Sequence, residues 1–452
     1  MTAENREFDA IIVGSGPGGA TVARQLAKQG ERVLILEWGS KAPIEGTLGQ
    51  FLSMAAIPGK SLLFTNELLS VVRGITTGGS SIFYYATAFD PPLEMLESHG
   101  LDISDEVEEA RNELPIAPLS DDLTGPMATR IMSSARELGY EWQKLPKFIY
   151  QDKCIAGCWK CSYGCPYGAK WNARMFIDEA VSDGAVLLNG AKVSKVIVQD
   201  GQATGVEFRR EGSRQRAFAS NVIISAGGIG SPMILRESGI TKAGYDFFFD
   251  PLICVMGTVD DISGGREIPM AAGIHMEEEG YLMTDMTVTN PVHVGLAAQV
   301  FQFNKLLSHS RTLQIMVKAK DELGGHLTDR GGVRKRLPPS DEQKLQKGYE
   351  RAKAILENAG AKDICKTRYL AAHPGGTVKV GELVDSNLQT ELSNLYVCDC
   401  SVIPEAWGLP PTLTLIGLGK RLAKHLATAK EKTLSASTGY QEGLPLAASG
   451  RG

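Results

Sequence analysis

The chain has 452 residues, of which 43% are hydrophobic and 22% are charged, and its net charge is −5 at pH 7. This length allows two or three domains with a large core. The small negative charge gives no electrostatic reason to expect nucleic acid or an anionic membrane as a partner. No run of about 18 apolar residues occurs, and the start MTAENREFDAIIVG lacks the basic and apolar regions of a signal peptide. These features predict a cytoplasmic protein without a membrane span.

The chain begins with a predicted strand, glycine-rich turn, helix and second strand. Phe8–Gly14 is an apolar run, residues 18–30 have helical character, and residues 32–40 contain the apolar run VLILE. A strand, helix and strand in this order form one βαβ unit.

The turn in this unit carries the G-x-G-x-x-G spacing of a dinucleotide site, with Gly14, Gly16 and Gly19 at the three positions and Gly18 between them. Such a turn brings the backbone and the N-terminus of the helix close to a pyrophosphate. Glu37 ends the second strand, where a carboxylate can accept hydrogen bonds from a ribose hydroxyl. The segment therefore predicts a Rossmann-like dinucleotide site, without separating FAD from NAD.

Later segments alternate between strand and helix signals. Residues 185–210 are predicted to form strands joined by a turn at Asp200–Gly201, and residues 221–239 form a strand, a glycine turn and a helix. Residues 341–359 have the apolar spacing of an amphipathic helix. The last organised stretch, residues 395–426, is predicted to be a strand, a turn and a closing helix.

Three further segments follow the first glycine motif. They are RGITTGGSS from Arg73, NVIISAGGIGSP from Asn221, and HPGGTVKVGELVDSNL with the following NLYVCDCSVIPEAWGLPPTLT. In this order, the four segments together resemble the glucose-methanol-choline (GMC) family of flavoenzymes. The resemblance implies FAD as the cofactor. It also implies contacts to FAD from further residues, namely Gly78, Gly79, Ser80, Val193, Ala226, Gly227, Asp399, Pro411 and Thr412.

The same resemblance implies an α/β fold, in which a Rossmann-like FAD-binding domain is joined to a smaller α+β substrate domain. The expected FAD domain consists of residues 1–235, with a cysteine segment at 150–172, and of residues 366–428. Residues 236–365 are the expected substrate domain, whose Met and Phe content favours an apolar substrate, and residues 429–452 are an expected flexible tail.

His373, in AAHPGGT, occupies the position of the family's catalytic histidine, which implies that it takes the proton of an alcohol. The family's second position, a His or Asn, corresponds here to Pro410, which has no side-chain donor or acceptor. His373 therefore acts alone, has a partner elsewhere, or serves other chemistry. The candidate partners are His275, His293, His309, Tyr84 and Glu405.

Four cysteines, Cys154, Cys158, Cys161 and Cys165, lie within twelve positions and precede Pro166. Their spacing exceeds that of the bacterial ferredoxin run by one residue, between the first two cysteines. The run favours a [4Fe-4S] cluster, whereas another cluster, zinc, disulfides or thiols without metal remain as alternatives.

Together these features predict an FAD-dependent dehydrogenase that transfers hydride between a small-molecule C–OH or C–H group and the flavin. An iron-sulfur cluster would carry single electrons to or from a partner protein or a quinone-like acceptor. Two alternatives remain: a reductase or isomerase of an unsaturated substrate, and an electron-transfer module.

Overall fold

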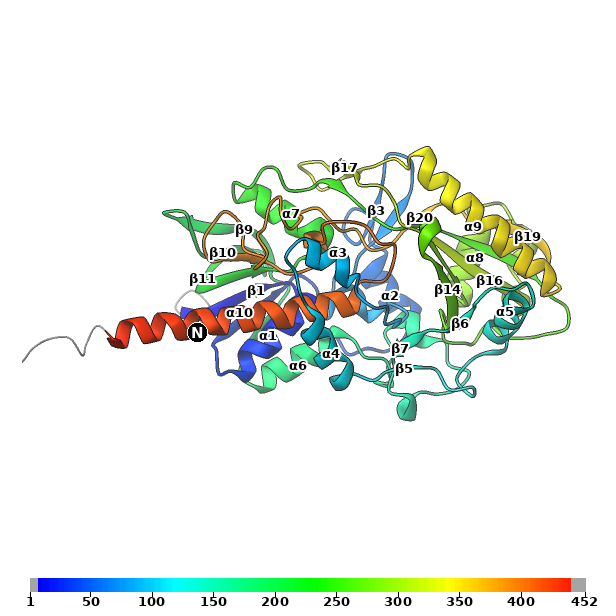
Figure 1. The fold of residues 1–452 in the computed structure, drawn as a ribbon, viewed down its shortest axis with the longest axis horizontal. Helices are drawn as coiled ribbons and strands as arrows, with labels where there is room; N and C mark the ends of the chain where they lie inside the picture. The colour runs from blue at the N-terminus through cyan, green and yellow to red at the C-terminus, as the bar shows by residue number, and fades with distance from the viewer. Residues whose placement is uncertain (1–6, 440–452) are drawn as a thin grey trace, which may run out of the picture.

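Two mixed β-sheets organise the protein in the computed structural model, which describes residues 7–439 (Figure 1). The first sheet has a parallel part that begins with the predicted βαβ unit and a long antiparallel hairpin at one edge. In sheet order its strands are β8 (Val186–Asn189), β2 (Val33–Glu37), β1 (Glu7–Val13), β11 (Ser213–Ile224), β10 (Gln202–Arg210) and β9 (Lys192–Gln199), and β21 (Leu395–Val397) pairs in parallel with β11.

Helices cover both sides of this sheet, as expected of a largely parallel arrangement. Helix α1 (Pro17–Lys28) packs against α6 (Ala173–Ser182) and α10 (Thr412–Gly439), while α7 (Gly227–Glu237) lies on the opposite side (Figure 1). All five residues of β2 are buried, which explains its uninterrupted apolar sequence.

The second sheet has nine strands, most of which belong to the predicted substrate domain. In order they are β3 (Leu62–Phe64), β4 (Ser70–Val72), β20 (Leu370–Ala371), β13 (Pro251–Thr258), β16 (Thr312–Ala319), β15 (Tyr281–Asp285), β14 (Ala272–Met276) and β6 (Gln143–Lys144), with β19 (Lys362–Lys366) also paired to β13. Strands from residues 62–72 and 143–144 thus join a sheet whose other strands come from beyond residue 250.

Helix α9 (Pro339–Asn358) packs on one face of the second sheet, against β13, β15 and β16. Val255, Ile315 and Val317 lie in the hydrophobic cluster on this side. The alternate residues Cys254, Met256 and Met316 belong instead to the cluster that continues into the FAD domain. One face of the sheet is therefore closed by α9, and the other faces the FAD domain.

The remaining elements are short or lie at the periphery. The helices are α2 (Leu48–Ala55), α3 (Leu93–Ser98), α4 (Ser104–Glu113), α5 (Pro126–Glu137) and α8 (Asn290–Ala298). The strands are β5 (Ile116–Pro118), β7 (Pro146–Phe148), β12 (Tyr245–Phe247), β17 (Gly324–Leu327) and β18 (Val333–Arg334). Short 3₁₀ turns include η2 (Gly79–Ile82), η4 (Lys160–Tyr163), η6 (Phe303–Lys305) and η8 (Cys400–Val402).

The predicted two-domain α/β architecture is confirmed, as are the strands joined at Asp200–Gly201 and the amphipathic helix, which spans Pro339–Asn358. The flexible tail predicted from residue 429 is wrong for its first part, because α10 continues to Gly439. Residues 440–452 lie outside the described residues.

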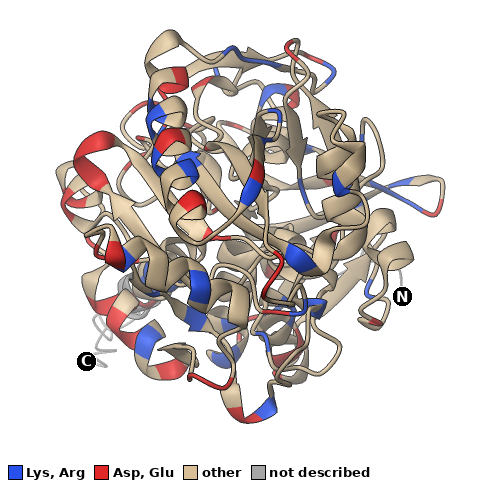
Figure 2. Cartoon of the chain, turned by 90° about the vertical axis from the view of Figure 1, so that its right-hand side faces the viewer, with Lys and Arg blue, Asp and Glu red and all other residues tan. Residues whose placement is uncertain are grey.

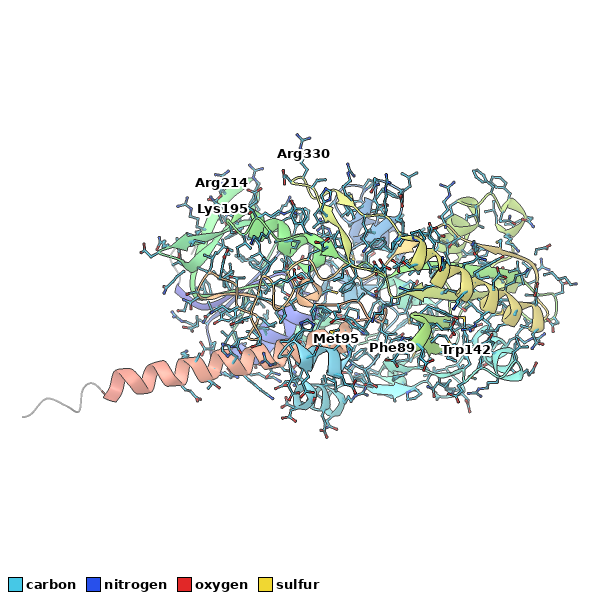
Figure 3. The ribbon with its side chains drawn as sticks, turned by 45° about the horizontal axis from the view of Figure 1, so that its top comes forward. Phe89, Met95, Trp142, Lys195, Arg214 and Arg330 are labelled. Atoms are coloured by element: carbon cyan, nitrogen blue, oxygen red, sulfur yellow. The ribbon has the colours of Figure 1, made fainter. Side chains whose placement is uncertain are left out.

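Charged residues of both signs are interspersed over the face shown in Figure 2. Lys195 and Arg214 project outward from the β9–β11 edge, whereas Trp142 lies in the other domain (Figure 3). At that edge, the Glu207 carboxylate is 3.4 Å from Arg214 and 3.6 Å from Arg216. Among the described helices, none combines the length and the apolar character that crossing a membrane requires.

Candidate active site

The turn between β1 and α1 has the geometry of a phosphate cradle. Gly14 adopts φ +101°, and a Cβ there would overlap the carbonyl oxygen of Ser225, so only glycine fits. Gly16 is the N-cap of α1 and is followed by Pro17, whose missing N–H costs nothing at this position. A Cβ on Gly16 would meet no protein atom within 4 Å. The turn is therefore open beside the N–H groups of α1, which is where a pyrophosphate would bind.

Gly18 and Gly19 serve a different purpose in the same motif. A Cβ on Gly18 would overlap the carbonyl of Cys398, and one on Gly19 would overlap the carbonyl of Gly14. Both glycines therefore allow α1 to pack closely on its neighbours, the role expected of the third glycine of the motif.

Glu37 links the first glycine motif to the second. Its buried carboxylate accepts hydrogen bonds from the backbone N–H of Ser15 at 3.1 Å, the Ser15 hydroxyl at 2.5 Å and the Gly39 N–H at 2.6 Å. Ser15 Oγ in turn accepts a hydrogen bond from the Gly78 N–H at 3.0 Å. Burial raises the pKa of Glu37, and these hydrogen bonds oppose that shift. The backbone N–H of Trp38 also lowers this pKa, so a fourth donor lies at the carboxylate, and the contact of Glu37 to a ribose hydroxyl stays a prediction.

The second glycine segment lies directly against the first. Gly78 has φ +94°, and a Cβ on Gly79 would lie 3.2 Å from the Cα of Gly16. The Ser80 hydroxyl accepts a hydrogen bond from the Gly74 N–H at 2.9 Å and so closes this loop on itself. Two segments that are more than 60 positions apart in the sequence therefore meet at one cradle.

Asp399 joins the third motif to the C-terminal one. Its carboxylate accepts hydrogen bonds from the Gly227 N–H at 2.8 Å, the Ser231 hydroxyl at 2.5 Å and the Ser401 N–H at 2.8 Å. Burial raises the pKa of Asp399, against the effect of these donors. The Ala226 N–H donates to the same Ser231 hydroxyl at 3.0 Å. Asp399 thus fixes the N-terminus of α7 beside η8.

The other predicted cofactor residues lie near these motifs in the fold. Val193 is a buried residue of β9, which packs against α7. Pro411 and Thr412 stand at the start of α10, and the Leu415 N–H donates to the Pro411 carbonyl at 2.9 Å. Their contacts to a cofactor stay predictions.

His373 lies where the substrate sheet meets the FAD domain. It lies two residues after β20, and the carbonyl of the next residue, Pro374, approaches α7 so closely that a Cβ on Gly228 would overlap it. The His373 side chain is 30% exposed and is therefore partly accessible.

Two buried charges hold the His373 ring, and neither was predicted. Nδ1 lies 3.0 Å from Oδ2 of Asp250 and 3.4 Å from Nζ of Lys318. Lys318 Nζ also lies 3.2 Å from the same Asp250 oxygen, and both charged side chains are 1% exposed. Because a carboxylate can only accept, Nδ1 carries the proton when it bonds to Asp250, and the lone pair is left on Nε2.

The charges around His373 oppose one another. Burial and the Lys318 charge lower the pKa of His373, and the hydrogen bond to Asp250 acts in the opposite direction. The resulting pKa lies below the ordinary value of histidine, so the ring is neutral near pH 7. Asp250 has a lowered pKa despite its burial, because Lys318 and His373 favour its charged form. The arrangement therefore holds a neutral imidazole ready to accept a proton.

A second buried ion pair fixes the backbone of Asp250, which adopts φ +47°. The Asp321 carboxylate accepts hydrogen bonds from the N–H groups of Phe249 at 3.2 Å and Asp250 at 3.0 Å. Lys335 Nζ lies 2.9 Å from this Asp321 carboxylate. The unusual backbone conformation of Asp250 is thus held in place by its surroundings.

The partners proposed for His373 from sequence have other contacts. His293 bonds to the Lys305 carbonyl and His309 to the Val288 carbonyl, both at 2.8 Å. Tyr84 donates to the Trp171 carbonyl at 2.9 Å, and the Glu405 carboxylate lies 3.1 Å from Nε2 of His99. His275 lies across β15 from Lys318, since both residues pair with Leu282. Of these candidates, only His275 shares a row of the sheet with the His373 partners.

Two matches to family models decide the identity of the protein. The N-terminal model described as GMC oxidoreductase matches residues 8–246, and the C-terminal model with the same description matches residues 296–419. The chain belongs to the GMC oxidoreductase family. It is therefore an FAD-dependent oxidoreductase of a family whose members act on CH–OH donors.

Relatives of this GMC oxidoreductase extend over nearly its whole length. A protein of Methanocaldococcus jannaschii that has no characterised function is 27% identical over 93% of the chain and 100% of its own length. The long-chain-alcohol oxidase FAO1 of Arabidopsis thaliana is 24% identical over 94% of the chain and 67% of its own length. The crystal structure of pyridoxine 4-oxidase from Mesorbium loti shares the fold, with a TM-score of 0.72 at 14% identity over 93% of this chain and 99% of the other.

The cysteine segment of this GMC oxidoreductase packs beside the second glycine motif. Lys170 is buried, and its Nζ donates to the carbonyls of Ile82, Tyr84 and Cys161 at 2.7–2.8 Å. Ile82 ends η2, the turn that begins at Gly79. Desolvation lowers the pKa of Lys170 to about 8, while the neighbouring cysteines raise it. The segment is therefore anchored to the same loop that lies against Gly16.

The four cysteines are free thiols in this arrangement. Burial raises the pKa of Cys154 to about 12 and that of Cys161 to about 11. Within residues 7–439, no three His, Cys, Asp or Glu side chains are placed to hold a metal ion. The geometry therefore gives no support to the predicted iron-sulfur cluster, and zinc and disulfide bonds gain no support either.

Asp250 and Lys318 are the candidate site residues that the sequence prediction missed. Each is a single charge within an apolar stretch, FFFDPLICV for Asp250 and LQIMVKA for Lys318. A lone charge in a buried strand needs a partner, and this was the available signal. It could have marked both residues as functional candidates, although not as partners of each other.

Proposed function

We propose that this protein oxidises an apolar primary alcohol, with His373 Nε2 accepting the hydroxyl proton. FAD, when bound, supplies the acceptor for the hydride that leaves the carbinol carbon. The alcohol then loses one hydride from carbon and one proton from oxygen, which leaves a carbonyl product. The cradle residues around Gly14, Gly16 and Glu37 would hold the cofactor.

The observation that carries this proposal is the pairing of His373 with Asp250 at 3.0 Å. In a family where a second His or Asn assists the histidine, Pro410 stands at the corresponding position and can assist nothing. Asp250 supplies what one histidine needs on its own, because it fixes the ring orientation and keeps the lone pair on Nε2. An apolar alcohol is supported by the name of the Arabidopsis relative, a long-chain-alcohol oxidase.

Anaerobic stopped-flow bleaching of the bound flavin by 1-dodecanol tests the proposal. We expect bleaching in the wild-type protein and a rate about 10²- to 10⁴-fold lower in His373→Ala, with the FAD content unchanged. His99→Ala is the matched control, since the His99 ring contacts the exposed Glu405 carboxylate, at 3.1 Å. Bleaching of His373→Ala at the wild-type rate would refute the role of His373. A wild-type flavin that no alcohol bleaches, but that an enone reoxidises, would favour the reductase or isomerase.

A second proposal is that the cysteine segment binds a [4Fe-4S] cluster that passes electrons to an external carrier. Its support is the near-ferredoxin spacing, together with two backbone N–H groups that already point at sulfur. The Lys160 N–H lies 3.5 Å from Cys158 Sγ, and the Lys170 N–H lies 3.4 Å from Cys165 Sγ. Iron and acid-labile sulfide analysis of anaerobically purified protein tests it. A protein that retains FAD but contains neither iron nor sulfide would exclude the relay.

A further inference from the structure

Lys305 is a buried cation without a partner. The residue is 1% exposed, and its Nζ has no hydrogen-bond partner. Every other buried lysine in the described part of the chain donates to carbonyls or pairs with a carboxylate, namely Lys147, Lys170, Lys318, Lys335, Lys379 and Lys420. A buried ammonium group that lacks such partners is costly, and this cost indicates that a bound group belongs there.

The backbone of Lys305 is held firmly although its side chain is not. Its carbonyl accepts hydrogen bonds from the Ser308 N–H at 3.1 Å, the Ser308 hydroxyl at 2.9 Å and His293 Nε2 at 2.8 Å. Nε2 of Gln314 lies 2.9 Å from Nδ1 of the His293 ring. Since the amide nitrogen can only donate, Nδ1 accepts and Nε2–H donates to Lys305. A chain of hydrogen bonds from β16 thus positions this one lysine.

Gln314 contributes a second unsatisfied atom. Its Oε1 is buried and has no partner, although its Nε2 is bonded to His293. Cys365 also lies near Lys305. Burial raises the pKa of Cys365, and the positive charge of Lys305 acts against that rise. Gln314 and Cys365 both pair with Met256 and so form one row across β16, β13 and β19. The row therefore carries the unpaired amide oxygen of Gln314, and its Cys365 end lies near the charge of Lys305.

The same face of the sheet leads to His373. Gln314, Met316 and Lys318 alternate along β16, so they lie on the face that α9 does not cover. Four residues of strand separate the Gln314 row from the Lys318 row, which corresponds to about 13 Å. The row between them holds Cys254 opposite Met316, both buried and apolar. The two polar ends are thus joined by an apolar middle.

We infer that Lys305 binds an oxyanion at the far end of the substrate, a carboxylate or a phosphate ester, about 13 Å from the carbon that is oxidised near His373. The oxidation at His373 rests on the proposed function, whereas the anion site does not. The substrate class is therefore an apolar chain with an alcohol at one end and an anion at the other.

Calorimetric titration of the FAD-loaded protein with dodecanoate, which cannot be oxidised as an alcohol, tests the anion site alone. We expect Lys305→Met to raise the dissociation constant about 10- to 100-fold, the range for a hydrogen bond to a charged group. Arg311→Met is the matched control, because Arg311 lies on the same segment but is exposed and paired with Asp260. Titration with dodecyl phosphate separates the two oxyanions. The inference would be overturned if Lys305→Met bound each of the two ligands, dodecanoate and dodecyl phosphate, as tightly as the wild-type protein does. It would also be overturned if the wild-type protein bound neither ligand.

Turnover distinguishes this inference from the proposed function. We expect the wild-type protein to have a kcat/KM for 12-hydroxydodecanoate or its phosphate counterpart about 10-fold or more above that for 1-dodecanol, and Lys305→Met to lose that preference. If no alcohol reduces the flavin, the proposed oxidation fails, and dodecanoate binding still decides the anion site. If 1-dodecanol is oxidised and Lys305→Met affects it as strongly as the charged substrates, the oxidation stands and the anion site fails.

Discussion

Replacing Asp250 by Asn changes a single atom in the group that holds His373. The carboxylate now accepts from His373 Nδ1 at 3.0 Å and from Lys318 Nζ at 3.2 Å. Because Nδ1–H and the Lys318 ammonium both donate to this oxygen, the asparagine amide would turn its carbonyl oxygen toward them. The substitution therefore removes the negative charge that favours the protonated ring once His373 has accepted a proton. General-base catalysis contributes about 10²- to 10⁴-fold, so we expect the rate of flavin bleaching to fall by about 10²-fold, at the lower end of that range.

The same substitution leaves the Lys318 ammonium buried at 1% exposure without a carboxylate. Breaking a buried pair from one side costs about 3–5 kcal/mol of the free energy of unfolding. The double variant Asp250→Asn with Lys318→Met removes the unpaired charge, so we expect it to recover most of this stability and none of the activity. Chemical denaturation of both variants measures the first effect, and anaerobic bleaching by 1-dodecanol measures the second.

The pH profile gives a test that protein stability alone cannot imitate. His373 must be neutral to accept a proton, so activity is lost as the pH falls through its pKa. Asp250 raises the pKa of His373 and Lys318 lowers it. The Cys400 thiol lies beside the His373 carbonyl and stays neutral, because burial raises the pKa of Cys400. Asp250→Asn should therefore shift the acid limb of kcat/KM to lower pH, and Lys318→Met should shift it to higher pH.

If the acid limb of kcat/KM shifted in the same direction in both variants, or did not shift in either, Asp250 and Lys318 would not control the pKa of His373. A bleaching rate of Asp250→Asn within a few-fold of the wild-type rate would show that the Asp250 charge does not support His373 as a base.

Two further predictions concern the cofactor cradle and its anchor. Gly14→Ala should prevent folding, since its Cβ overlaps the carbonyl of Ser225. Gly16→Ala should fold and lose FAD, since its Cβ projects into the open turn. Circular dichroism measures folding and the ratio of flavin to protein measures FAD binding, and full FAD retention by Gly16→Ala would contradict the cradle. Lys170→Met should lower the free energy of unfolding by about 2–4 kcal/mol, because three buried carbonyls lose their donor. Calorimetry measures that loss, and an unchanged melting temperature would show that the cysteine segment is anchored by other contacts.

The sequence alone predicted the elements whose signal is local. The apolar run before Gly14, the glycine spacing and the acid at Glu37 all lie within one βαβ unit, so their roles follow from short-range geometry. The helix at Pro339–Asn358 was predicted for the same reason, because its apolar period is contained in one stretch of chain.

The cysteine run shows the limit of local spacing. Four thiols within twelve positions match a ferredoxin pattern closely, and yet no three such side chains among the described residues are placed to hold a metal ion, so the cluster stays a proposal. Whether four sulfurs converge depends on the backbone between them, and here Lys170 fixes part of that backbone by bonding to Cys161 and Ile82. Spacing limits which ligands can meet and does not decide that they do.

The sequence by itself thus determined the family resemblance, and it predicted the cofactor cradle and the catalytic histidine. Only the tertiary structure placed Asp250 and Lys318 around His373, and left Lys305 without a partner. The physical reason is that these residues lie on different strands and loops of one sheet, at positions 250, 318, 373 and 305. Strand pairing brings such distant positions together, and a single charge in an apolar strand indicates that a partner exists without indicating which residue it is.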